Sequence, residues 1–328
     1  MSTIGRVSVV VPLLDEARKV ERLVADIAGQ DFEGELEILV ADGGSTDGTV
    51  ELLTAAAERE GLPLQVLPNP ERLVAPALNL CIARATGDLI VRLDAKSSYP
   101  SDYVRRLARA AEETGAENVG ALVVPTGTTA VERAAAAAMA SPFGGIMWWR
   151  EGSSAERVEV DTVYCGAFRP EVFRDVGLFD AAMGPDHDEE FNLRLRETGG
   201  RIVLDPSIRA NYTPVGTYRE LWGKYYNYGF FKPRVMAKHR QVASVRSLVP
   251  PVFVASLAVL VPLATRSSAA RRLLALQAAA YVAGAVALGA DSVRRRGEPW
   301  SLLPAVVAAF ATFHVAFGVG FLRGLLRR

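Results

Sequence analysis

The chain has 328 residues, half of them hydrophobic, and equal numbers of basic and acidic side chains, 37 of each. The charges are unevenly divided, because residues 246–328 hold ten arginines and no lysine against only Asp291 and Glu298. The first 245 residues are therefore net acidic, which argues against the basic face of a nucleic-acid-binding protein. With only Cys81 and Cys165, a disulfide framework or a zinc cluster is not expected, and a reducing compartment fits.

Short apolar strands alternate with helical patterns over the first 125 residues. The predicted strands cover residues 7–12, 36–40, 64–67, 89–93 and 119–124. The predicted helices cover residues 20–27, 49–56 and 76–85, and another begins near Ser101. This alternation predicts an α/β fold with a doubly wound, mostly parallel sheet, in which ligands bind at the carboxyl ends of the strands.

The next 80 residues have a less regular pattern. A helix is predicted at residues 130–140, and it is followed at residues 141–150 by a loop of turn formers and aromatics that could cover a site. Within this loop, Trp148 and Trp149 are candidates for stacking on a sugar or for packing the loop itself. The remaining elements are a strand at 158–164, a turn at 165–168, a helix at 170–176, a helix that opens at 184–192 and a strand at 202–204.

The last third of the chain has the composition of a membrane-bound segment. Residues 218–240 are dense in aromatic and cationic side chains, which suits the headgroup zone of a bilayer. Three apolar stretches follow, at residues 248–264, 273–290 and 300–322, and their lengths are near those of spanning helices. The alternative is a helical bundle packed on the soluble domain.

These patterns divide the chain into a soluble domain of residues 1–217, an amphipathic interfacial segment of residues 218–245 and a transmembrane region of residues 246–328. Because residues 1–6 lack the apolar core of a signal peptide, the soluble domain is expected in the cytoplasm. We therefore expect a multi-pass protein of the inner membrane, with about three apolar helices.

The arginines fit three spanning helices poorly. With the soluble domain inside, the arginines at residues 266–272 and 323–328 would lie outside, against the positive-inside rule, and only those at 294–296 would lie inside. A re-entrant or interfacial segment, broken at Pro250, Pro251 and Pro262, would place the arginines better.

Three acidic positions stand out as candidates for chemistry. Asp42 and Asp94 each follow a predicted strand, and Asp188 begins a helix far along the chain. An enzyme that moves a group off a diphosphate needs carboxylates or a metal near the phosphates and a separate base for the incoming hydroxyl. Three acids at strand and helix ends could supply both. The alternatives are an N-cap for Asp94, a turn-forming aspartate for Asp42 and a helix N-terminus enriched in acids for Asp188.

The order of these motifs resembles the inverting glycosyltransferases of family 2, whose nucleotide-sugar domain has the GT-A fold. The residues that carry the resemblance are 7–12 with Glu16, 42–49 (DGGSTDGT), 94–96 (DAK) and 188–190 (DEE). Within the family, residues 92–100 and 141–144 are similar to the succinoglycan-type glucosyltransferases, which extend a lipid-linked oligosaccharide at the inner membrane. The similarity extends over the whole chain.

The resemblance implies roles on the donor side. Pro12 and Glu16 would lie along the nucleoside, and Asp42 would hydrogen-bond the uracil ring. Asp94 would be the first acid of the D-x-D element, which binds a divalent cation, Mg²⁺ or Mn²⁺, on the diphosphate. The third position of that element is Lys96 in this sequence, and a charged ammonium cannot coordinate a metal. Either Asp94, phosphate oxygens and water hold the ion, or Lys96 itself neutralises part of the diphosphate, or the enzyme is weakened.

The resemblance also implies roles on the acceptor side. Asp188 matches the aspartate that deprotonates the acceptor hydroxyl, and His187 replaces the glutamate that usually precedes it. Glu189 and its neighbour Glu190 are alternative bases, of which only one should face the site. Lys232 and Arg234 correspond to a region of cations near the diphosphate or the lipid pyrophosphate, although anchoring to anionic lipid explains them equally well.

The interpretation that follows is a membrane-bound inverting glycosyltransferase. It would move a sugar, most simply glucose, from a UDP-sugar to a polyprenyl-diphosphate-linked saccharide in exopolysaccharide or cell-envelope glycan synthesis. One alternative is a non-catalytic scaffold subunit that binds a nucleotide sugar in a polysaccharide assembly complex, which the changes at Lys96 and His187 would suit. A processive polysaccharide synthase is a weaker alternative, because the sequence lacks the Gln-x-x-Arg-Trp signature of that class.

Overall fold

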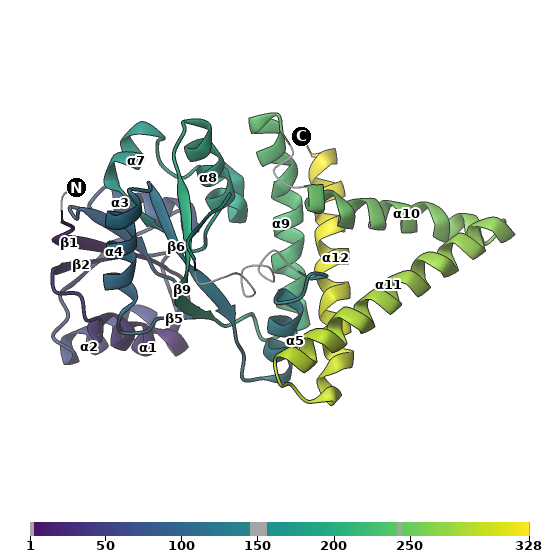
Figure 1. The fold of residues 1–328 in the computed structure, drawn as a ribbon, viewed down its shortest axis with the longest axis horizontal. Helices are drawn as coiled ribbons and strands as arrows, with labels where there is room; N and C mark the ends of the chain where they lie inside the picture. Colours follow the sequence, from purple (N-terminus) through teal and green to yellow (C-terminus); the bar gives the residue numbers. More distant parts are fainter. Residues whose placement is uncertain (1–2, 145–155, 242–244, 328) are drawn as a thin grey trace. The chain divides into compact units, whose positions relative to one another are not determined.

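The computed structural model describes residues 3–144, 156–241 and 245–327. The chain forms two compact units, each described by itself: a sheet unit of Met1–Val124 and Ser153–Tyr212, and a helical unit of Pro125–Gly152 and Thr213–Arg328 (Figure 1). Trp148 and Trp149, with most of the predicted loop at residues 141–150, lie outside the described residues.

Four parallel strands form one half of the sheet, in the order β3-β2-β1-β4. Their bounds are β1 (Arg6–Leu13), β2 (Glu35–Asp42), β3 (Leu64–Pro68) and β4 (Leu89–Arg92). β1 and β4 are almost wholly buried aliphatic runs, the pattern of strands that are covered on both faces. This half confirms the four strands that the sequence predicts there.

Helices cover both faces of this half. Their bounds are α1 (Ala17–Ala28), α2 (Thr49–Arg59), α3 (Val74–Ile82) and α4 (Tyr103–Thr114). α1, α2 and α4 share one core with alternate residues of β4, Leu89 and Val91. α3 packs on the opposite face, where the Cys81 thiol donates to the carbonyl oxygen of Leu39. Because side chains alternate along a strand, Arg92 lies on the α3 face.

The other half of the sheet contains antiparallel pairings. Its strands are β5 (Ser97–Ser98), β6 (Asn118–Pro125), β7 (Val158–Glu159), β8 (Ala167–Phe168) and β9 (Ile202–Tyr212). β8 pairs antiparallel with β4 and β6, while β5 and β7 pair antiparallel with β9. The predicted α/β fold class is confirmed, and the whole sheet is mixed.

The segment before and within β8 differs from the sequence prediction. Only Val158–Glu159 of the strand predicted at residues 158–164 is a strand, and half of the turn predicted at 165–168 is β8 itself. A Cβ atom at Gly166 would lie 2.1 Å from Oδ1 of Asn118. Only glycine therefore fits where the chain enters the sheet between β4 and β6, and this glycine reads as a turn former in the sequence.

An aromatic cluster fixes the start of α8 (His187–Glu197), which follows α7 (Pro170–Asp175) and a 3-10 turn, η1 (Ala181–Asp186). Phe168, Phe173, Phe179 and Phe191 pack together, with ring centroids 4.6 to 6.1 Å apart. The ring of His187 packs edge-on against Phe179. This apolar packing holds the first turn of α8, and so Asp188, against β8.

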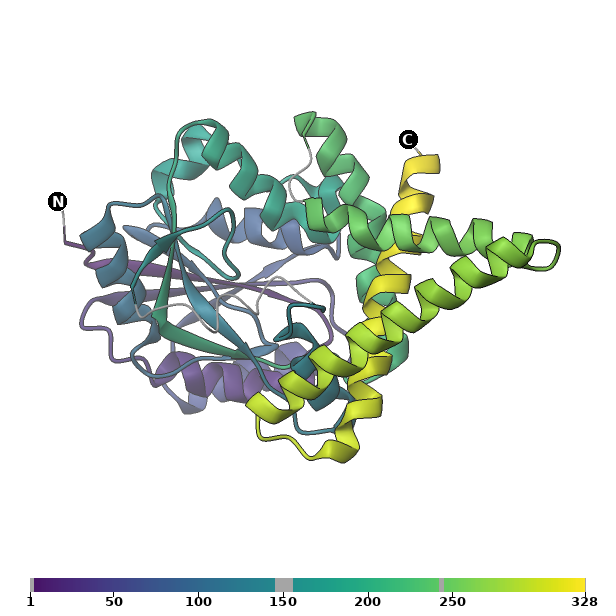
Figure 2. The ribbon, with the colours of Figure 1, turned by 45° about the vertical axis from the view of Figure 1, so that its right-hand side comes forward.

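The helical unit combines one internal helix with the helices of the C-terminal region. Its bounds are α5 (Ala130–Met139), α9 (Tyr218–His239), η2 (Val245–Leu248), α10 (Val249–Ala264), α11 (Ser268–Arg295), η3 (Trp300–Leu302) and α12 (Leu303–Leu326). The alanines of α5 share a core with Phe310 and Phe313 of α12. Among the described residues, three helical segments are long and apolar enough to cross a membrane: Val245–Ala264, Ser268–Arg295 and Trp300–Leu326 (Figure 2).

Candidate active site

The loops that leave β1, β2 and β4 carry most of the predicted site residues. Pro12 of β1 pairs with Ala41, the residue before Asp42 at the end of β2. Glu16 precedes α1, and Asp94 follows β4 by two residues. Parallel strands end at one edge of a sheet, so this edge is where a ligand is expected.

Asp42 organises its own loop. Its Oδ2 accepts hydrogen bonds from the backbone N–H groups of Gly44 (2.9 Å) and Ser45 (3.0 Å), and its Oδ1 accepts from the Ser45 hydroxyl (2.6 Å). Gly44 has φ +74°, a conformation that favours glycine. The turn-forming role considered from the sequence is therefore present in the structure, and the carboxylate is largely buried.

A group that we call the Asp94 cluster comprises Glu16, Asp94 and Lys96. The Lys96 ammonium lies 3.3 Å from Oε1 of Glu16, whose other oxygen lies 2.5 Å from Nζ of Lys19. Oδ1 of Asp94 accepts a hydrogen bond from the Lys96 backbone N–H at 2.9 Å. The backbone N–H of Asp94 donates to the Tyr99 hydroxyl at 2.7 Å, and this hydrogen bond holds the loop in place.

Electrostatics keep the Lys96 ammonium charged. Burial lowers the pKa of Lys96, but the carboxylates of Asp94 and Glu16 outweigh burial and raise it above its ordinary value. The side chain remains 41% exposed, so it can turn toward a ligand. Lys96 therefore presents a permanent positive charge next to Asp94.

A second group, the Asp188 cluster, comprises Arg92, His187 and Asp188. Oδ1 of Asp188 lies 2.5 Å from Nη1 of Arg92 and 3.2 Å from Nε2 of His187. The other ring nitrogen of His187, Nδ1, is 2.8 Å from the carbonyl oxygen of Gly184. The side chains of Arg92 and His187 are only 6% and 5% exposed, whereas that of Asp188 is 27% exposed. The Asp188 carboxylate thus has two buried partners and is still partly exposed.

The partners of Asp188 decide its protonation. Burial alone would raise the pKa of this carboxyl, but the Arg92 guanidinium, and after it His187, hold the pKa well below its usual range. Asp188 is therefore ionised at any pH at which the protein is expected to work.

Arg92 connects the two clusters. Burial disfavours its charge, but the carboxylates of Asp188 and Asp94 outweigh burial and raise the pKa of Arg92. Its guanidinium is thus within electrostatic reach of both acids, although Asp94 and Asp188 lie 94 residues apart in the chain. Sequence patterns alone give Arg92 no role, although a charged residue inside an otherwise apolar strand is the signal that points to it.

The acids that follow Asp188 have different environments. Glu190 is fully buried, and both of its oxygens accept hydrogen bonds from the Arg194 guanidinium, at 2.8 and 3.0 Å. Arg194 also donates to the backbone carbonyls of Val176 and Leu178. Glu190 is therefore a structural residue of α8, which leaves Glu189, of intermediate exposure, as the alternative base.

Lys232 and Arg234 belong to the helical unit. Lys232 is buried in α9, and Arg234 is exposed, with its guanidinium over the rings of Phe230 (5.5 Å) and Phe231 (4.8 Å). The sheet unit by itself brings together Glu16, Asp94, Lys96 and Asp188, and it does not contain these two cations.

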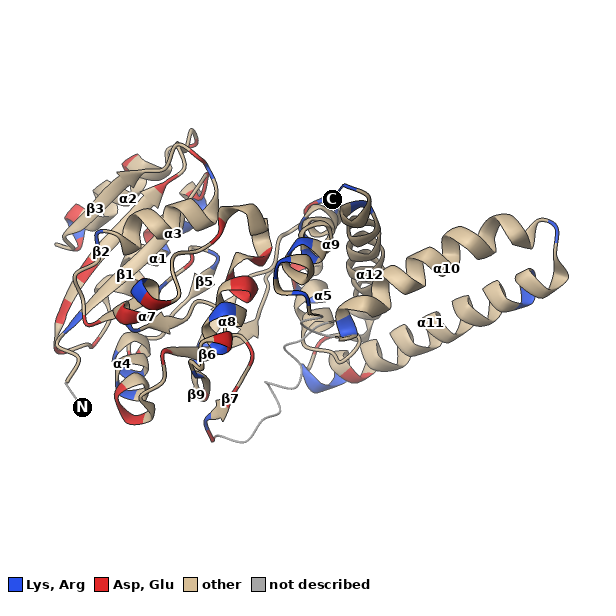
Figure 3. Cartoon of the chain, turned by 90° about the horizontal axis from the view of Figure 1, so that it is seen from above, with Lys and Arg blue, Asp and Glu red and all other residues tan. Residues whose placement is uncertain are grey.

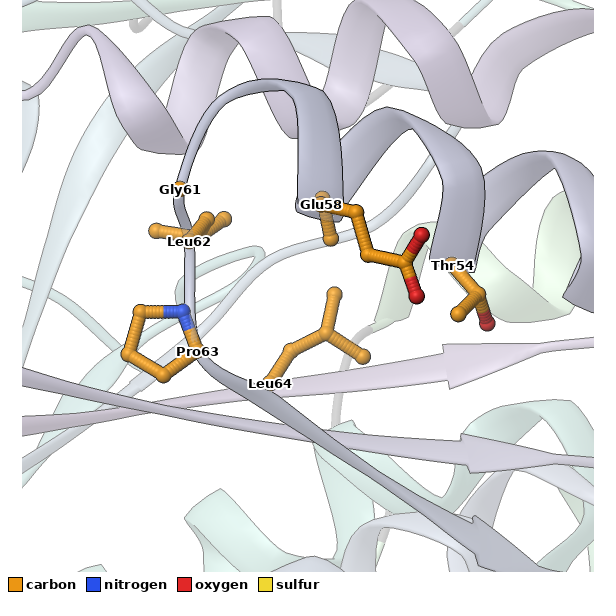
Figure 4. A pocket seen from close by; sticks show the side chains of 7 residues that line it. Thr54, Glu58, Gly61, Leu62, Pro63 and Leu64 are labelled. Atoms are coloured by element: carbon orange, nitrogen blue, oxygen red, sulfur yellow. The ribbon is translucent and has the colours of Figure 1, made fainter.

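A shallow pocket is found elsewhere in the sheet unit (Figure 4). It lies between the end of α2 and the start of β3, and it is lined by Thr54, Ala57, Glu58, Gly61, Leu62, Pro63 and Leu64. Glu58 is the only ionisable side chain in this lining. Because the pocket includes no member of either cluster, it is not the candidate active site.

The donor groups near Asp94 fit one kind of metal site only. The part of the chain that the structure describes has no group of three His, Cys, Asp or Glu side chains that could hold a metal ion. Lys96 is a cation, and Asp188 is paired with Arg92. These residues fit an ion that is held by Asp94 together with phosphate oxygens and water, an arrangement that Mg²⁺ commonly adopts, and not an ion caged by protein.

Comparisons with known proteins support a single family. The sequence model of glycosyl transferase family 2 matches residues 8–172. The succinoglycan biosynthesis protein ExoA of Rhizobium meliloti (strain 1021) is 30% identical over 321 residues, which cover 97% of this chain and 94% of that protein. An undecaprenyl-phosphate 4-deoxy-4-formamido-L-arabinose transferase of Serratia proteamaculans (strain 568) is 34% identical over 113 residues, which cover 34% of this chain and 35% of that protein.

A solved structure shares the fold. The mannosyltransferase PcManGT from Pyrobaculum calidifontis, determined with GDP-Man and Mn²⁺, superimposes with a TM-score of 0.66 at 20% sequence identity. The match covers 98% of this chain and 87% of that one. At this level of identity the likeness concerns the fold, which is the GT-A arrangement followed by apolar helices.

Proposed function

The chain belongs to glycosyltransferase family 2, and from that premise we propose that it is an inverting enzyme that acts on a membrane-bound acceptor. The donor is a UDP-sugar, with glucose as the sugar, and the acceptor is a polyprenyl-diphosphate-linked saccharide of exopolysaccharide or envelope glycan synthesis. The full-length similarity to a succinoglycan biosynthesis protein supports this substrate class. The similarity to an undecaprenyl-phosphate transferase over about a third of the chain agrees with a polyprenyl carrier.

One observation carries the proposal. Arg92 ends β4 two residues before Asp94, and its Nη1 lies 2.5 Å from Oδ1 of Asp188, so the sheet unit holds an acid suited to the donor diphosphate near an acid suited to the acceptor hydroxyl. A transferase needs these two functions a few ångströms apart, because the reacting atoms must meet in one site.

The donor side is assigned to the loops after β1, β2 and β4. Pro12 and Glu16 line the nucleoside, and Asp42 faces the base from its rigid turn. Asp94 would be the protein ligand of a divalent cation, Mg²⁺ or Mn²⁺, which would supply positive charge to the leaving diphosphate. Lys96 adds a second positive charge, which its exposed side chain can bring to the phosphates.

The acceptor side is assigned to the Asp188 cluster. Asp188 accepts the proton of the acceptor hydroxyl while the hydroxyl oxygen attacks the anomeric carbon and the bond from that carbon to the diphosphate breaks. A single displacement of this kind inverts the carbon and leaves a β-linkage. A carboxylate whose pKa is depressed is a weak base, so it takes the proton late, when bonding to carbon has already made the hydroxyl acidic. Glu189 is the alternative base.

The remaining assignments concern the membrane. We propose residues 1–217 as the GT-A domain, 218–245 as an interfacial segment and 246–328 as the membrane region of an inner-membrane protein whose catalytic domain is cytoplasmic. Lys232 and Arg234 are proposed to bind the donor diphosphate or the lipid pyrophosphate.

A transfer assay on the full chain tests the proposal. The protein, purified in detergent, is incubated with a panel of UDP- and GDP-sugars and a polyprenyl-diphosphate-linked saccharide, and the product is identified by mass spectrometry. We expect one UDP-hexose to extend the lipid by one residue. Binding of UDP without turnover on any acceptor would reject the proposed reaction, and turnover with GDP-sugars alone would reject the proposed donor.

A further inference from the structure

α9 and α12 lie side by side and run in the same direction. At their first turns, the Tyr218 hydroxyl donates to the carbonyl oxygen of Ala305 at 2.8 Å. Near the end of α12, a Cβ atom at Gly324 would lie 2.3 Å from the carbonyl oxygen of Phe230, in the second half of α9, so the two backbones touch there. α9 therefore accompanies α12 over most of the length of α12 (Figure 1).

α9 is too polar to pass through hydrocarbon. It carries six fully charged side chains, which are Arg219, Glu220, Lys224, Lys232, Arg234 and Lys238. Those at positions 219, 220, 234 and 238 are exposed in the helical unit, so the charges face outward at both ends of the helix. Charged side chains within a bilayer core are rare and costly, whereas aromatic and cationic residues together suit the headgroup zone. Since α9 cannot cross the bilayer, α12 does not cross it either.

The apolar character of α12 has another explanation. Of its most apolar window, 44% is buried within the protein, against 6% for the α10 segment and 11% for α11. α12 packs against α5, α9, α10 and α11, and Phe310 and Phe313 are fully buried in the core of the helical unit. A helix that is apolar on all sides is either buried in a protein or surrounded by lipid, and here the protein buries close to half of it, far more than of α10 or α11.

α10 and α11 have the opposite character. They project together away from α9 and α12, and their surfaces carry almost no charge except near the turn that joins them and at the far end of α11 (Figures 2 and 3). The segment Val245–Ala264 has 20 residues, which is about 30 Å of helix and matches the hydrocarbon thickness of a bilayer. The connecting turn carries Arg266, and the start of α11 carries Arg271 and Arg272. These arginines cannot stay in the bilayer core and so must emerge on its far side.

We propose that the chain crosses the bilayer twice, through the α10–α11 hairpin, while α9 and α12 lie together along the membrane surface. The lipid bilayer is the partner that covers the exposed faces of α10 and α11. The C-terminus then stays on the same side as the α11–α12 connection, which differs from the three crossings expected from hydropathy. Of the described residues, six arginines, at residues 246, 294–296, 323 and 327, share that side, and only the three at the hairpin tip lie opposite, as the positive-inside rule prefers.

Single-cysteine labelling of the full chain tests this topology. Ser268→Cys at the hairpin tip, Arg295→Cys at the end of α11 and Arg327→Cys after α12 replace exposed residues. The native Cys81 and Cys165 are both buried, and the unsubstituted protein serves as the control for their labelling. Each variant is exposed to a membrane-impermeant maleimide in right-side-out spheroplasts and again after permeabilisation.

We expect the cysteine at position 268 to be labelled in intact spheroplasts. We expect the cysteines at positions 295 and 327 to be labelled only after permeabilisation. Labelling of 327 together with 268 would show that α12 crosses the bilayer and would overturn the proposal. Equal behaviour of all three positions would show that the hairpin does not cross, and it would overturn the proposal equally.

A matched pair of arginine substitutions gives an independent readout. Leu276→Arg places a charge on the exposed face of α11, and Thr312→Arg places one near the middle of α12. We expect Leu276→Arg to cause at least a tenfold loss of membrane-integrated protein and Thr312→Arg to leave most of it in place. An equal loss from both substitutions would contradict a surface position for α12.

Discussion

The Asp94 cluster and the Asp188 cluster each place a cationic side chain beside a carboxylate, and they differ in how deeply that cation is buried. In the Asp94 cluster the cation, Lys96, is 41% exposed and sits on a flexible stem. In the Asp188 cluster the cation, Arg92, is 6% exposed and is held within a central strand. An exposed lysine can leave its carboxylates for an incoming phosphate, whereas a buried arginine fixes one acid in one charge state. The first cluster is therefore suited to binding a charged donor, and the second to keeping a base ionised.

Removing the base should have the largest effect. We expect Asp188→Asn to lower kcat by about 10²- to 10⁴-fold, the usual contribution of a general base, while the Kd for the donor nucleotide changes little. The measurement is turnover on the lipid acceptor together with calorimetric titration of UDP.

Glu189→Gln, one residue along the same helix, is the matched control for that substitution, and we expect its activity to be close to that of the wild type. Thermal unfolding of both variants separates loss of the base from loss of the fold, because removing one partner of a buried ion pair can cost about 3–5 kcal/mol. Near-normal turnover in Asp188→Asn with a loss in Glu189→Gln would transfer the role of base to Glu189.

Removing the buried cation should change the pH dependence. Arg92 keeps the pKa of Asp188 low. In Arg92→Met the acid limb of the plot of kcat against pH should therefore shift to higher pH, by about 1 to 3 pH units. Arg92→Lys, which keeps a charge, should move it less. A limb that does not move would mean that Asp188 is not the titrating base or that Arg92 does not control it.

The ion pair between Arg92 and Asp188 should also make the stability of the protein depend on pH. Because the folded pKa of Asp188 lies below the unfolded value of about 3.9, the stabilisation is present above that pH and is lost as the pH falls through the folded pKa. The difference in Tm between wild type and Arg92→Met should thus be large at pH 7 and shrink under acid conditions.

Removing the donor acid should weaken binding more than it slows chemistry. A hydrogen bond or ligand bond to a charged group contributes about 1.5–3 kcal/mol, so Asp94→Asn should raise the Kd for the UDP-sugar by about 10- to 100-fold. Titration with the donor in the presence of Mg²⁺ measures this. An unchanged Kd would show that Asp94 does not bind the donor, and the two clusters would then not divide donor binding and base catalysis between them.

Removing the exposed cation should have the smallest effect in the presence of metal. Lys96→Ala should cost about 1 kcal/mol, or about fivefold in donor affinity, since its side chain is partly solvated. With EDTA the loss should be larger, because the ion and the ammonium then no longer share the diphosphate charge. Equal wild-type activity in EDTA and in added Mg²⁺ or Mn²⁺ would reject the metal assigned to Asp94.

The parts that sequence predicted well are those fixed by local pattern. β1, β2 and β4 are short aliphatic runs, and their burial follows from that composition alone. The sequence predicts a turn at β8 because two residues carry no periodicity. The place of β8 between β4 and β6 depends on the space that Gly166 leaves beside Asn118.

The parts that sequence did not predict depend on contacts between distant residues. The pairing of Arg92 with Asp188 joins positions 96 residues apart, and the assignment of α5 to the helical unit depends on its packing with α12. The hydropathy of α12 is the same for a spanning helix and for a buried one, so only its contact with α9 separates them.

The stereochemistry of the product shows whether the two clusters form one site for a single displacement. If the two clusters form one site for a single displacement, transfer from an α-linked UDP-sugar must give a β-linked product, which the anomeric proton coupling in an NMR spectrum of the purified glycolipid reports. The account predicts the β-anomer alone. An α-linked product would contradict direct attack by an acceptor hydroxyl that Asp188 deprotonates.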